Sequence, residues 1–341
     1  MVVFSGFNGS ASYHGKQGET IDCIIKNAAM GALKFSKIDP DKAFLLVALG
    51  TNDSHCTALQ LQSDAGLNRS EGNESDVPAF DVTTNSMGGV GLIRDASQYL
   101  FNNFIIANEK GAYYTGEVDA HSEGQPLKAI HQVMESGERK LNHLAGIIFV
   151  HKRKALAQTV AEQLEMTISC SIDITAGPAS LAYAFAYADV IAKSYQSHVV
   201  VAEVMHSKTN YLASAVVISP VESPGFIIHS LNSPGIKQTN HSLANISGYA
   251  NLAGATREQW EQGMDEPSRT VLVAYNCGIS TIEDAKKNPV MKDIASIIQP
   301  EEKQSVIECL DKAFMTNEIK DNDYVGIMGL GPSGGINVYR F

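Results

Sequence analysis

One residue able to do chemistry is a serine at the junction between a strand and a helix. Ser86 follows VPAFDVTT, which is typical of a buried strand, and precedes VGLIRDASQYLF, which is typical of a helix. The N–H groups and the dipole at the start of a helix stabilise an anionic nucleophile. A serine is a strong nucleophile only when a base removes its proton, and serine also commonly caps helices. Ser86 is therefore either a candidate nucleophile or a helix cap.

A histidine at a second junction of this kind is the candidate base. His151 follows the apolar run LAGIIFV and precedes KALAQTVAEQL, which has helical periodicity. An imidazole changes charge near neutral pH and can accept the proton of a hydroxyl. A histidine with satisfied hydrogen bonds at the end of a strand is the alternative. To act together, Ser86 and His151 must lie within hydrogen-bond reach or one bridging water.

Three consecutive cations follow this histidine. Lys152, Arg153 and Lys154 precede the start of a helix, where positive charges oppose the helix dipole. Helix stability therefore does not explain them. They are candidates for binding the phosphate groups of a ligand or an acidic partner protein, and a solvated loop is the alternative.

Glycines near both ends of the chain are candidates for close backbone approach to a ligand. The segment 329–335, GLGPSGG, has the spacing of a dinucleotide-binding loop. A strand, INVYRF, follows it instead of the helix that would receive a pyrophosphate. We therefore interpret it as a tight turn near the candidate site, with Gly331 and Gly334 as binding residues. Gly88 and Gly89, which follow the candidate serine, are assigned the same role.

The elements that position these residues recur three times along the chain. The expected passes cover residues 1–118, 119–232 and 233–341, and the first opens with an apolar strand at MVVFSGF. Strands that alternate with helices indicate right-handed crossovers and a mainly parallel sheet covered by helices. Two strands joined without a helix close each pass, which predicts an antiparallel edge. Because there is no long linker, we expect the three passes to pack as one body.

Composition excludes several classes of protein. The 341 residues are 44% hydrophobic and 18% charged, as in ordinary globular proteins. A net charge of −11 argues against nucleic-acid or anionic-membrane binding. The sequence predicts no signal peptide and no membrane span, and hence a cytoplasmic protein. Five widely spaced cysteines without a Cys-x-x-Cys motif predict reduced thiols rather than zinc sites or disulfides. Cys277, after TVLVAYN at the end of an expected strand, is the only thiol that the sequence places for chemistry, but a buried small residue is the better interpretation.

Several segments resemble β-ketoacyl-acyl-carrier-protein synthase III enzymes, which are condensing enzymes of the thiolase fold. IIKNAAMGALKFSKIDPDKAFLLVALGT, TALQLQSDAGL and PAFDVTTNSMGG are similar to the N-terminal half of that family. SIDITAGPASLAYAFAYADVIAKS is similar to the same region a second time. The segment CLDKAFMTNEIKDNDYVGIMGLGPSGGINVYRF is similar to the last helix and the final glycine-rich β-turn-β. The order of these segments carries the resemblance, because each of them is loose.

The resemblance implies acyl transfer, but the active-site residues depart from the family pattern. The family uses a cysteine thiolate at a helix N-terminus, aided by a histidine and an asparagine. Ser86 stands in the cysteine position of the first alignment, and Pro178, which cannot attack, stands there in the second. His151 matches the histidine of the family motif P-H-Q-A-N, whose asparagine is replaced by Lys154. TAGPASL occupies the place of the second asparagine motif, with Gly177 or Pro178 where the amide is needed.

The resemblance therefore predicts a layered α-β-α-β-α fold built from βαβαβαββ halves, although the family has two halves and this chain has three passes. It implies an acyltransferase acting on an acyl thioester of coenzyme A or an acyl-carrier protein, in fatty-acid-like or specialised-metabolite (polyketide) biosynthesis. No tightly bound cofactor or metal is expected. The family pairs sheets across a two-fold axis, which implies a homodimer or a heterodimer with a related synthase. The alternative function is a catalytically degenerate subunit that stabilises an active synthase; a scaffold without ligand is a third.

Overall fold

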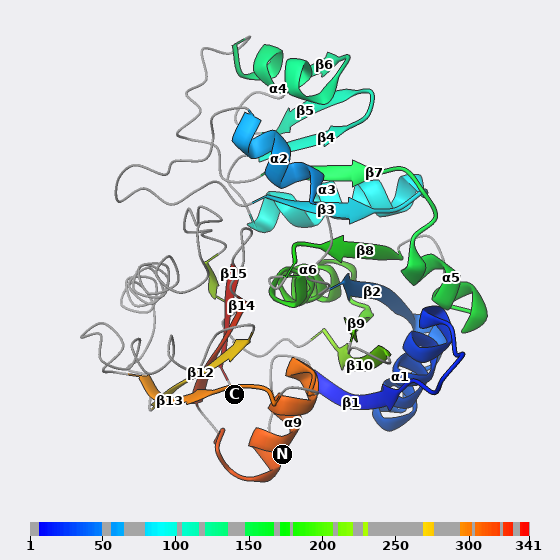
Figure 1. Ribbon diagram of the computed structural model, residues 1–341, viewed down its shortest axis with the longest axis vertical. Helices are drawn as coiled ribbons and strands as arrows, with labels where there is room; N and C mark the ends of the chain where they lie inside the picture. Colours follow the sequence, from blue (N-terminus) through cyan, green and yellow to red (C-terminus); the bar gives the residue numbers. More distant parts are fainter. Residues whose placement is uncertain are drawn as a thin grey trace.

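The apolar runs of the sequence form the strands of two sheets in the computed structural model (Figure 1). The structure describes residues 7–49, 56–64, 79–100, 104–115, 120–135, 147–166, 171–177, 180–206, 211–220, 228–230, 269–275, 294–301, 304–320, 323–329 and 335–340.

The larger sheet has ten strands and consists of two five-stranded half-sheets. From its outer edge to the centre, half-sheet A contains β1 (Phe7–His14), β10 (Tyr211–Ile218), β9 (His198–His206), β2 (Ala43–Leu49) and β8 (Ile172–Thr175). From the centre to its outer edge, half-sheet B contains β3 (Ala79–Thr83), β7 (Ile147–His151), β4 (Phe104–Asn108), β5 (Gly111–Thr115) and β6 (Ala120–Glu123). The half-sheets join through the antiparallel pairing of β8 with β3.

The smaller sheet repeats the pattern of each half-sheet. Its strands are, in spatial order, β13 (Ile294–Ile298), β12 (Arg269–Tyr275), β14 (Asp323–Gly329), β15 (Gly335–Arg340) and β11 (Ile228–Ser230). In this sheet and outward from the centre in both half-sheets, two parallel pairs are followed by two antiparallel pairs. The chain therefore contains three copies of one strand arrangement.

The innermost strand of each half-sheet follows, in the chain, a strand of the other half-sheet. In the smaller sheet the chain passes from β12 to β13 within one sheet. In the larger sheet it leaves half-sheet A after β2 and enters half-sheet B at β3, and it leaves half-sheet B after β7 and returns to half-sheet A at β8. The second crossing is made by residues 152–155.

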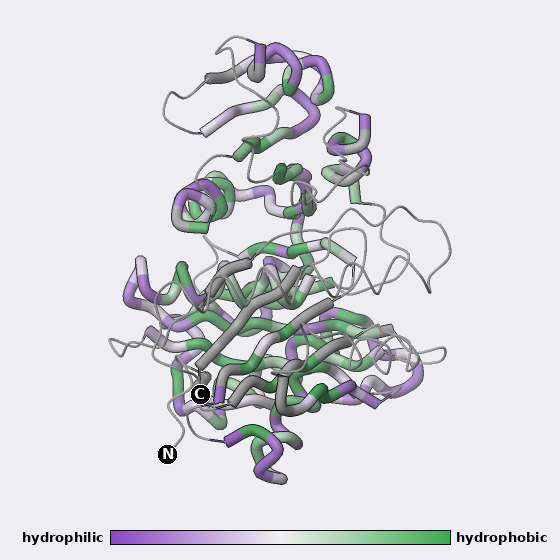
Figure 2. Tube along the Cα trace, turned by 90° about the vertical axis from the view of Figure 1, so that its left-hand side faces the viewer, coloured by the Kyte–Doolittle hydropathy of each residue, from purple (hydrophilic) through white to green (hydrophobic). Residues whose placement is uncertain are grey.

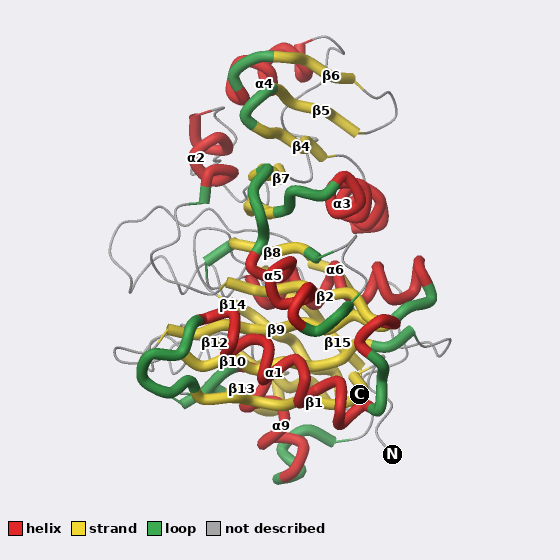
Figure 3. Tube along the Cα trace, turned by 90° about the vertical axis from the view of Figure 1, so that its right-hand side faces the viewer, coloured by secondary structure: helices red, strands yellow, loops and turns green. Residues whose placement is uncertain are grey.

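Helices cover both faces of the larger sheet. On the outer face, α1 (Ile21–Ser36) and α5 (Leu156–Gln163) pack on half-sheet A (Figure 3). On the same face α2 (Thr57–Asp64) and α4 (Pro126–Glu135) pack on half-sheet B. The inner face carries α3 (Met87–Leu100) and α6 (Ser180–Tyr195), which contact each other. A short 3-10 helix, Pro40–Lys42, precedes β2.

The core lies around α6, which separates the two sheets. This helix contacts β2 and β9 on one side and β14 and β15 on the other, and its residues 180–192 are all buried. A helix between two sheets is expected to be apolar on all sides. Figure 2 shows hydrophobic residues, in green, along strands of the larger sheet. Helix α9 (Val306–Met315) also bridges the sheets, because it contacts β1, β10 and β12.

The predicted alternation of strands and helices is confirmed, with three differences. The strand expected at MVVFSGF lies outside the described residues except for Phe7, and the first strand that the structure describes, β1, runs from Phe7 to His14 and is largely polar. It can be polar because it pairs on one side with β10, and its Ser12 bonds Ser214. Strand β6 (AHSE) has no apolar run to reveal it. The closing strands of each pass are antiparallel as expected, but a further strand lies beside them at the edge: β1 beside β10, β6 beside β5 and β11 beside β15. The boundaries after residues 118 and 232 stay a prediction.

Candidate functional site

Ser86 lies between β3 and α3 and caps that helix. Its Oγ accepts a hydrogen bond from the backbone N–H of Gly89 at 2.9 Å, and its carbonyl accepts one from Val90 at 3.2 Å. The Oγ also lies 3.3 Å from Oγ1 of Thr84. The side chain is half-buried. The sequence predicts Ser86 either as a helix cap or as a nucleophile. The structure shows the capping contact. It also places the hydroxyl at a helix N-terminus, so the role as a nucleophile stays a prediction.

Gly89 allows the first turn of α3 to approach these hydroxyls closely. A Cβ at this position would lie 2.3 Å from Oγ1 of Thr84 and 2.9 Å from Oγ of Ser86. Gly88 is exposed in the same turn. The close approach of Gly89 is made to the protein's own hydroxyls, and the role of both glycines in substrate binding stays a prediction.

His151 ends β7 at the same edge of the sheet as Ser86. Strands β3 and β7 are parallel, with Thr83 opposite His151, and the N–H of Thr84 donates to the carbonyl of His151 at 3.1 Å. Along β7, Phe149 faces the outer helices and Val150 faces the inner core. Because strand side chains alternate, the imidazole lies on the outer face beside α2, whereas Ser86 begins α3 on the inner face. Ser86 and His151 therefore lie at the same edge of the sheet but on opposite faces of it.

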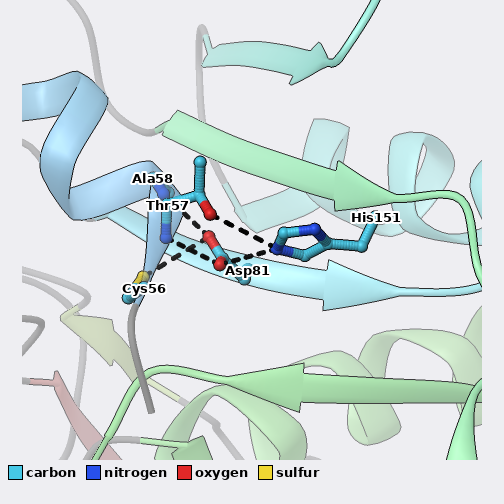
Figure 4. Close-up of polar contacts among 5 residues, drawn as sticks. All are labelled: Cys56, Thr57, Ala58, Asp81 and His151. Carbon is cyan, nitrogen blue, oxygen red and sulfur yellow. Dashed lines mark hydrogen bonds and ion pairs between the residues drawn. The ribbon is translucent and has the colours of Figure 1, made fainter.

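A buried carboxylate collects the polar groups on this outer face (Figure 4). Asp81 of β3 is 2% exposed. Its oxygens accept the backbone N–H groups of Thr57 and Ala58, each at 2.7 Å, and the Sγ–H of Cys56 at 3.4 Å. Nε2 of His151 lies 2.9 Å from Oδ2 of Asp81 and 3.5 Å from Oγ1 of Thr57. The carboxylate thus caps α2 and joins a thiol to an imidazole.

Asp173 of β8 makes the corresponding cap in half-sheet A. Its oxygens accept the N–H groups of Leu156 and Ala157 at the start of α5, at 2.7 and 2.8 Å. Burial raises the pKa of this carboxyl to about 6, although the two N–H donors act in the opposite direction. A third cap joins the sheets: Glu203 of β9 accepts from Val306 and Ile307 of α9 at 3.0 and 3.4 Å.

Sequence reasoning did not single out Asp81 or Cys56. The available signal was the repeated pair of strands AFDVT and IDIT, in which an aspartate occupies a strand that is otherwise apolar. A buried aspartate in such a strand needs hydrogen-bond donors. The donors come from the starts of α2 and α5. Which helix lies beside which aspartate depends on how the chain passes between the two half-sheets. No local pattern reveals that path.

The three cations lie on the crossing between β7 and α5. Lys152, Arg153 and Lys154 are all exposed. Nζ of Lys154 lies 2.6 Å from Oε2 of Glu162. Their expected role in binding phosphate or an acidic carrier stays a prediction.

Several sequence-based candidates lie outside the described residues, namely Pro178, Cys277, Gly331 and Gly334. Pro178 follows β8, which runs antiparallel to β3. The two positions that the resemblance aligns with the nucleophile therefore follow strands that end at opposite edges of the sheet.

Two negative findings apply to the part of the chain that the structure describes. No helix there is long and apolar enough to cross a membrane. No group of three or more histidine, cysteine or acidic side chains there is arranged to hold a metal ion.

Comparison with known proteins finds similarity in structure alone. No family model and no curated protein matches the sequence. The 3-oxoacyl-[acyl-carrier-protein] synthase III of Aquifex aeolicus is 11% identical, with a TM-score of 0.55 over 98% of this chain and 99% of its own. A priming β-ketosynthase of a polyketide pathway is 12% identical, with a TM-score of 0.53 over 100% and 96%. The synthase III of Xanthomonas oryzae is 9% identical, with a TM-score of 0.52 over 99% and 98%.

At these identities the likeness concerns the fold. The layers of helix and sheet and the repeated strand arrangement agree with it, and the predicted resemblance is confirmed at that level. The chain has the thiolase-like α/β fold of the condensing enzymes.

Proposed function

We propose that this protein transfers acyl groups from an acyl thioester of coenzyme A or of a carrier-bound phosphopantetheine. One observation carries the proposal. In a fold shared with β-ketoacyl synthases, the adjacent parallel strands β3 and β7 end with a hydroxyl at a helix N-terminus and with an imidazole held by a carboxylate. Acyl transfer requires a nucleophile and a base that can take its proton, and both kinds of group stand at this edge.

The proposed roles follow from the positions of the groups. Ser86 takes or positions the acyl group, and the start of α3 stabilises the negative charge that develops there. His151, paired with Asp81 at 2.9 Å, acts as the base at the same edge and, because it lies on the opposite face of the sheet from Ser86, does so through a bridging water. The exposed cations Lys152 and Arg153 follow His151 in the chain, and we assign them the phosphate groups of coenzyme A or an acidic carrier surface.

The test is acylation by a panel of acyl-coenzyme A thioesters, read by intact mass. The wild type should gain the mass of one acyl group, and peptide mapping should place it at the edge where β3 and β7 end. Ser86→Ala tests the serine directly, and Ser180→Ala, at the start of α6 in half-sheet A, is the matched control. The absence of an adduct on the wild type with every thioester would overturn the proposal.

A second candidate function is favoured by the capping contact of Ser86. Its Oγ accepts the Gly89 N–H at 2.9 Å, as a purely structural serine would. On this alternative the chain is a catalytically degenerate subunit that stabilises an active synthase. Co-purification of a second condensing enzyme, together with no adduct on this chain, would support the alternative.

The predicted oligomer is part of the same proposal. The resemblance implies that sheets pair across a two-fold axis between subunits. Here β3 and β8 make an antiparallel pairing at the centre of a ten-stranded sheet within one chain. A homodimer or heterodimer would then use other surfaces. Light scattering of the purified chain tests for the homodimer, and co-purification of a second synthase tests for the heterodimer.

A further inference from the structure

Two helices connect the larger sheet to the smaller one, and their contacts differ in chemistry. Helix α6 is buried along residues 180–192, and its apolar side chains belong to a core that includes strands of both sheets. Helix α9 contacts β1 and β10 of the larger sheet and β12 of the smaller one (Figure 1). Between α9 and the larger sheet lies a row of hydroxyl, carboxyl and imidazole groups. We call it the polar interface, and it consists of Ser10, Ser12, His14, Glu203, Ser214, Ser305, Glu308 and Asp311.

The centre of the polar interface is a chain of hydroxyls beside a buried carboxyl. Oγ of Ser305, the N-cap of α9, donates to Oγ of Ser214 at 2.6 Å. Oγ of Ser214 also lies 2.6 Å from Oγ of Ser12. Glu203 lies opposite Ser214 in the sheet and accepts two N–H groups from the first turn of α9, at 3.0 and 3.4 Å. Because Glu203, Ser214 and Ser305 are at most 4% exposed, separating α9 from the sheet brings all three into water.

Further carboxyl groups lie on α9 beside this centre. Glu308 completes the capping box of α9 by accepting the N–H of Ser305 at 3.1 Å. Its Oε1 lies 3.4 Å from Nε2 of His14, which is exposed. Asp311 accepts a hydrogen bond from Ser10. The polar interface therefore places two carboxyl groups of α9 near the buried carboxyl of β9.

The charged groups around Glu203 do not neutralise it. Among the described residues no lysine or arginine forms an ion pair with Glu203, because Lys312 pairs with Glu301 at 2.5 Å and Lys193 pairs with Asp189 at 2.9 Å. Burial raises the pKa of Glu203 to about 7, and the charge of Glu308 acts in the same direction, whereas the two N–H donors of α9 lower it. The titratable groups on the elements packed on this face of β9, and on the segments flanking α9, are His14 of β1, Tyr183, Tyr187, Asp189 and Lys193 of α6, Glu308, Cys309, Asp311 and Lys312 of α9, and Glu301 and Glu318.

We propose that the docking of α9 on the larger sheet depends on protonation of Glu203, so that α9 is held while this carboxyl is neutral and is released more readily when it ionises. In the closed interface an ionised Glu203 is a buried charge near other carboxylates, and opening returns it to water. Helix α6 keeps the two sheets together through apolar contacts, so α9 can separate without global unfolding. This docking does not depend on the proposed acyl transfer.

The direction of the pH effect follows from the raised pKa of Glu203. The folded state binds this proton more tightly than the open state does, in which the carboxyl has its ordinary value of 4.5. The contribution of Glu203 to docking is therefore fully present below pH 4.5 and is lost as the pH rises through about 7.

Hydrogen exchange of the full-length protein, read by mass spectrometry, tests the proposal. The amides of α9 should be less protected than those of α6, because α9 opens without the rest of the protein. The protection factor of α9 should fall about thirtyfold between pH 5 and pH 7. Equal protection of α9 and α6 at every pH would overturn the proposal, because α9 would then separate only on global unfolding. An α9 protection factor that is the same at both pH values would also overturn it.

Three variants assign the effect to one carboxyl. Glu203→Gln keeps an acceptor for the first turn of α9 but does not ionise, and it should remove most of the fall in α9 protection. Ser214→Ala removes a hydroxyl of the polar interface but no ionisable group, and it should lower α9 protection by a similar factor at pH 5 and pH 7. Asp189→Asn removes another buried carboxyl of raised pKa, on α6, and should leave the fall unchanged. A fall in Glu203→Gln as large as in the wild type would contradict the assignment, and the wild-type profile decides alone if this variant does not fold.

Discussion

Half-sheets A and B are built alike and differ at one polar cluster. Both have the same strand order outward from the centre, and both hold an aspartate that caps the neighbouring outer helix. In half-sheet A this aspartate, Asp173, meets backbone donors from a segment that reads Ala, Leu, Ala, and the charge of Arg153 also acts on it. In half-sheet B, Asp81 meets the same kind of donors and also a thiol and an imidazole. The comparison assigns the aspartates to the fold and the added groups to chemistry.

Removing either aspartate should have the largest effect on stability. Asp81→Ala and Asp173→Ala each leave two helix N–H groups without their acceptor, which costs about 2–4 kcal/mol of the free energy of unfolding. The loss should be smaller for Asp173, because its raised pKa shows that burial already disfavours its charge. Urea denaturation followed by circular dichroism measures both. Equal stability of Asp81→Ala and the wild type would contradict the conclusion that Asp81 stabilises the fold by capping α2.

Asp173 should contribute to the pH dependence of stability, together with Asp189, whose pKa burial also raises to about 6. Burial raises its pKa from 3.8 to about 6, so the folded state binds a proton more tightly than the unfolded chain does. Its contribution to stability is therefore fully present below pH 3.8 and is lost as the pH rises to about 6. At about 1.4 kcal/mol for each pKa unit, the full loss is about 3 kcal/mol.

Asp173→Asn should flatten this part of the profile, because an amide keeps a hydrogen-bond acceptor but does not ionise. Glu203 acts in the same direction up to a higher pH, since burial raises its pKa to about 7. Glu203→Gln is therefore the control that flattens a different window. The midpoint of urea denaturation, measured from pH 4 to pH 8 for each protein, gives the comparison. An unchanged slope in Asp173→Asn would contradict the assignment.

Two glycines lie within one turn of each other at the start of α3, and we expect their replacement by alanine to change the free energy of unfolding in opposite directions. In Gly89→Ala the new Cβ would lie 2.3 Å from Oγ1 of Thr84, so the helix start must shift, at a cost of about 1–3 kcal/mol. A Cβ added at Gly91 would meet no atom within 4 Å, so Gly91→Ala should gain about 0.5–1 kcal/mol from helix propensity. Thermal unfolding of the two variants measures the difference, and a loss in both would contradict it.

Most of the helices and strands can be predicted from the sequence, but fewer of the residues of the candidate site can. Apolar runs such as AFLLVAL and the helical periodicity of α1 and α6 are local signals, and they predicted strands and helices correctly. Strand β6 was missed because four residues with a single apolar side chain give no periodicity. The exchange of β3 and β8 between the half-sheets depends on long-range pairing, which no local pattern encodes.

The site shows the same limit at single residues. Ser86 and His151 were identified because each stands where a strand meets a helix, and the structure places both at one edge. Their opposite faces follow from strand alternation, which depends on the exact end of β7. Asp81 was not identified because its donors come from the start of α2, more than twenty residues earlier in the chain. For the same reason the sequence predicts Cys56 only as an ordinary reduced thiol.

The smallest expected change in stability comes from converting the cluster of half-sheet B into that of half-sheet A. The triple variant Cys56→Ala, Thr57→Leu and His151→Leu places the residues of half-sheet A around Asp81. Because Asp173 caps its helix among such neighbours, the free energy of unfolding should change by less than about 1 kcal/mol. If the acyl transfer proposed above depends on His151, the acyl adduct should disappear.

This variant also decides between the two interpretations of the cluster. If the thiol, hydroxyl and imidazole stabilise the fold, their removal leaves a buried carboxylate with fewer partners, and the loss should reach several kcal/mol. If they serve chemistry, the two N–H donors of α2 satisfy Asp81 as those of α5 satisfy Asp173. Urea denaturation of the triple variant beside Asp81→Ala makes the distinction, because the second protein loses the cap itself whereas the first keeps it.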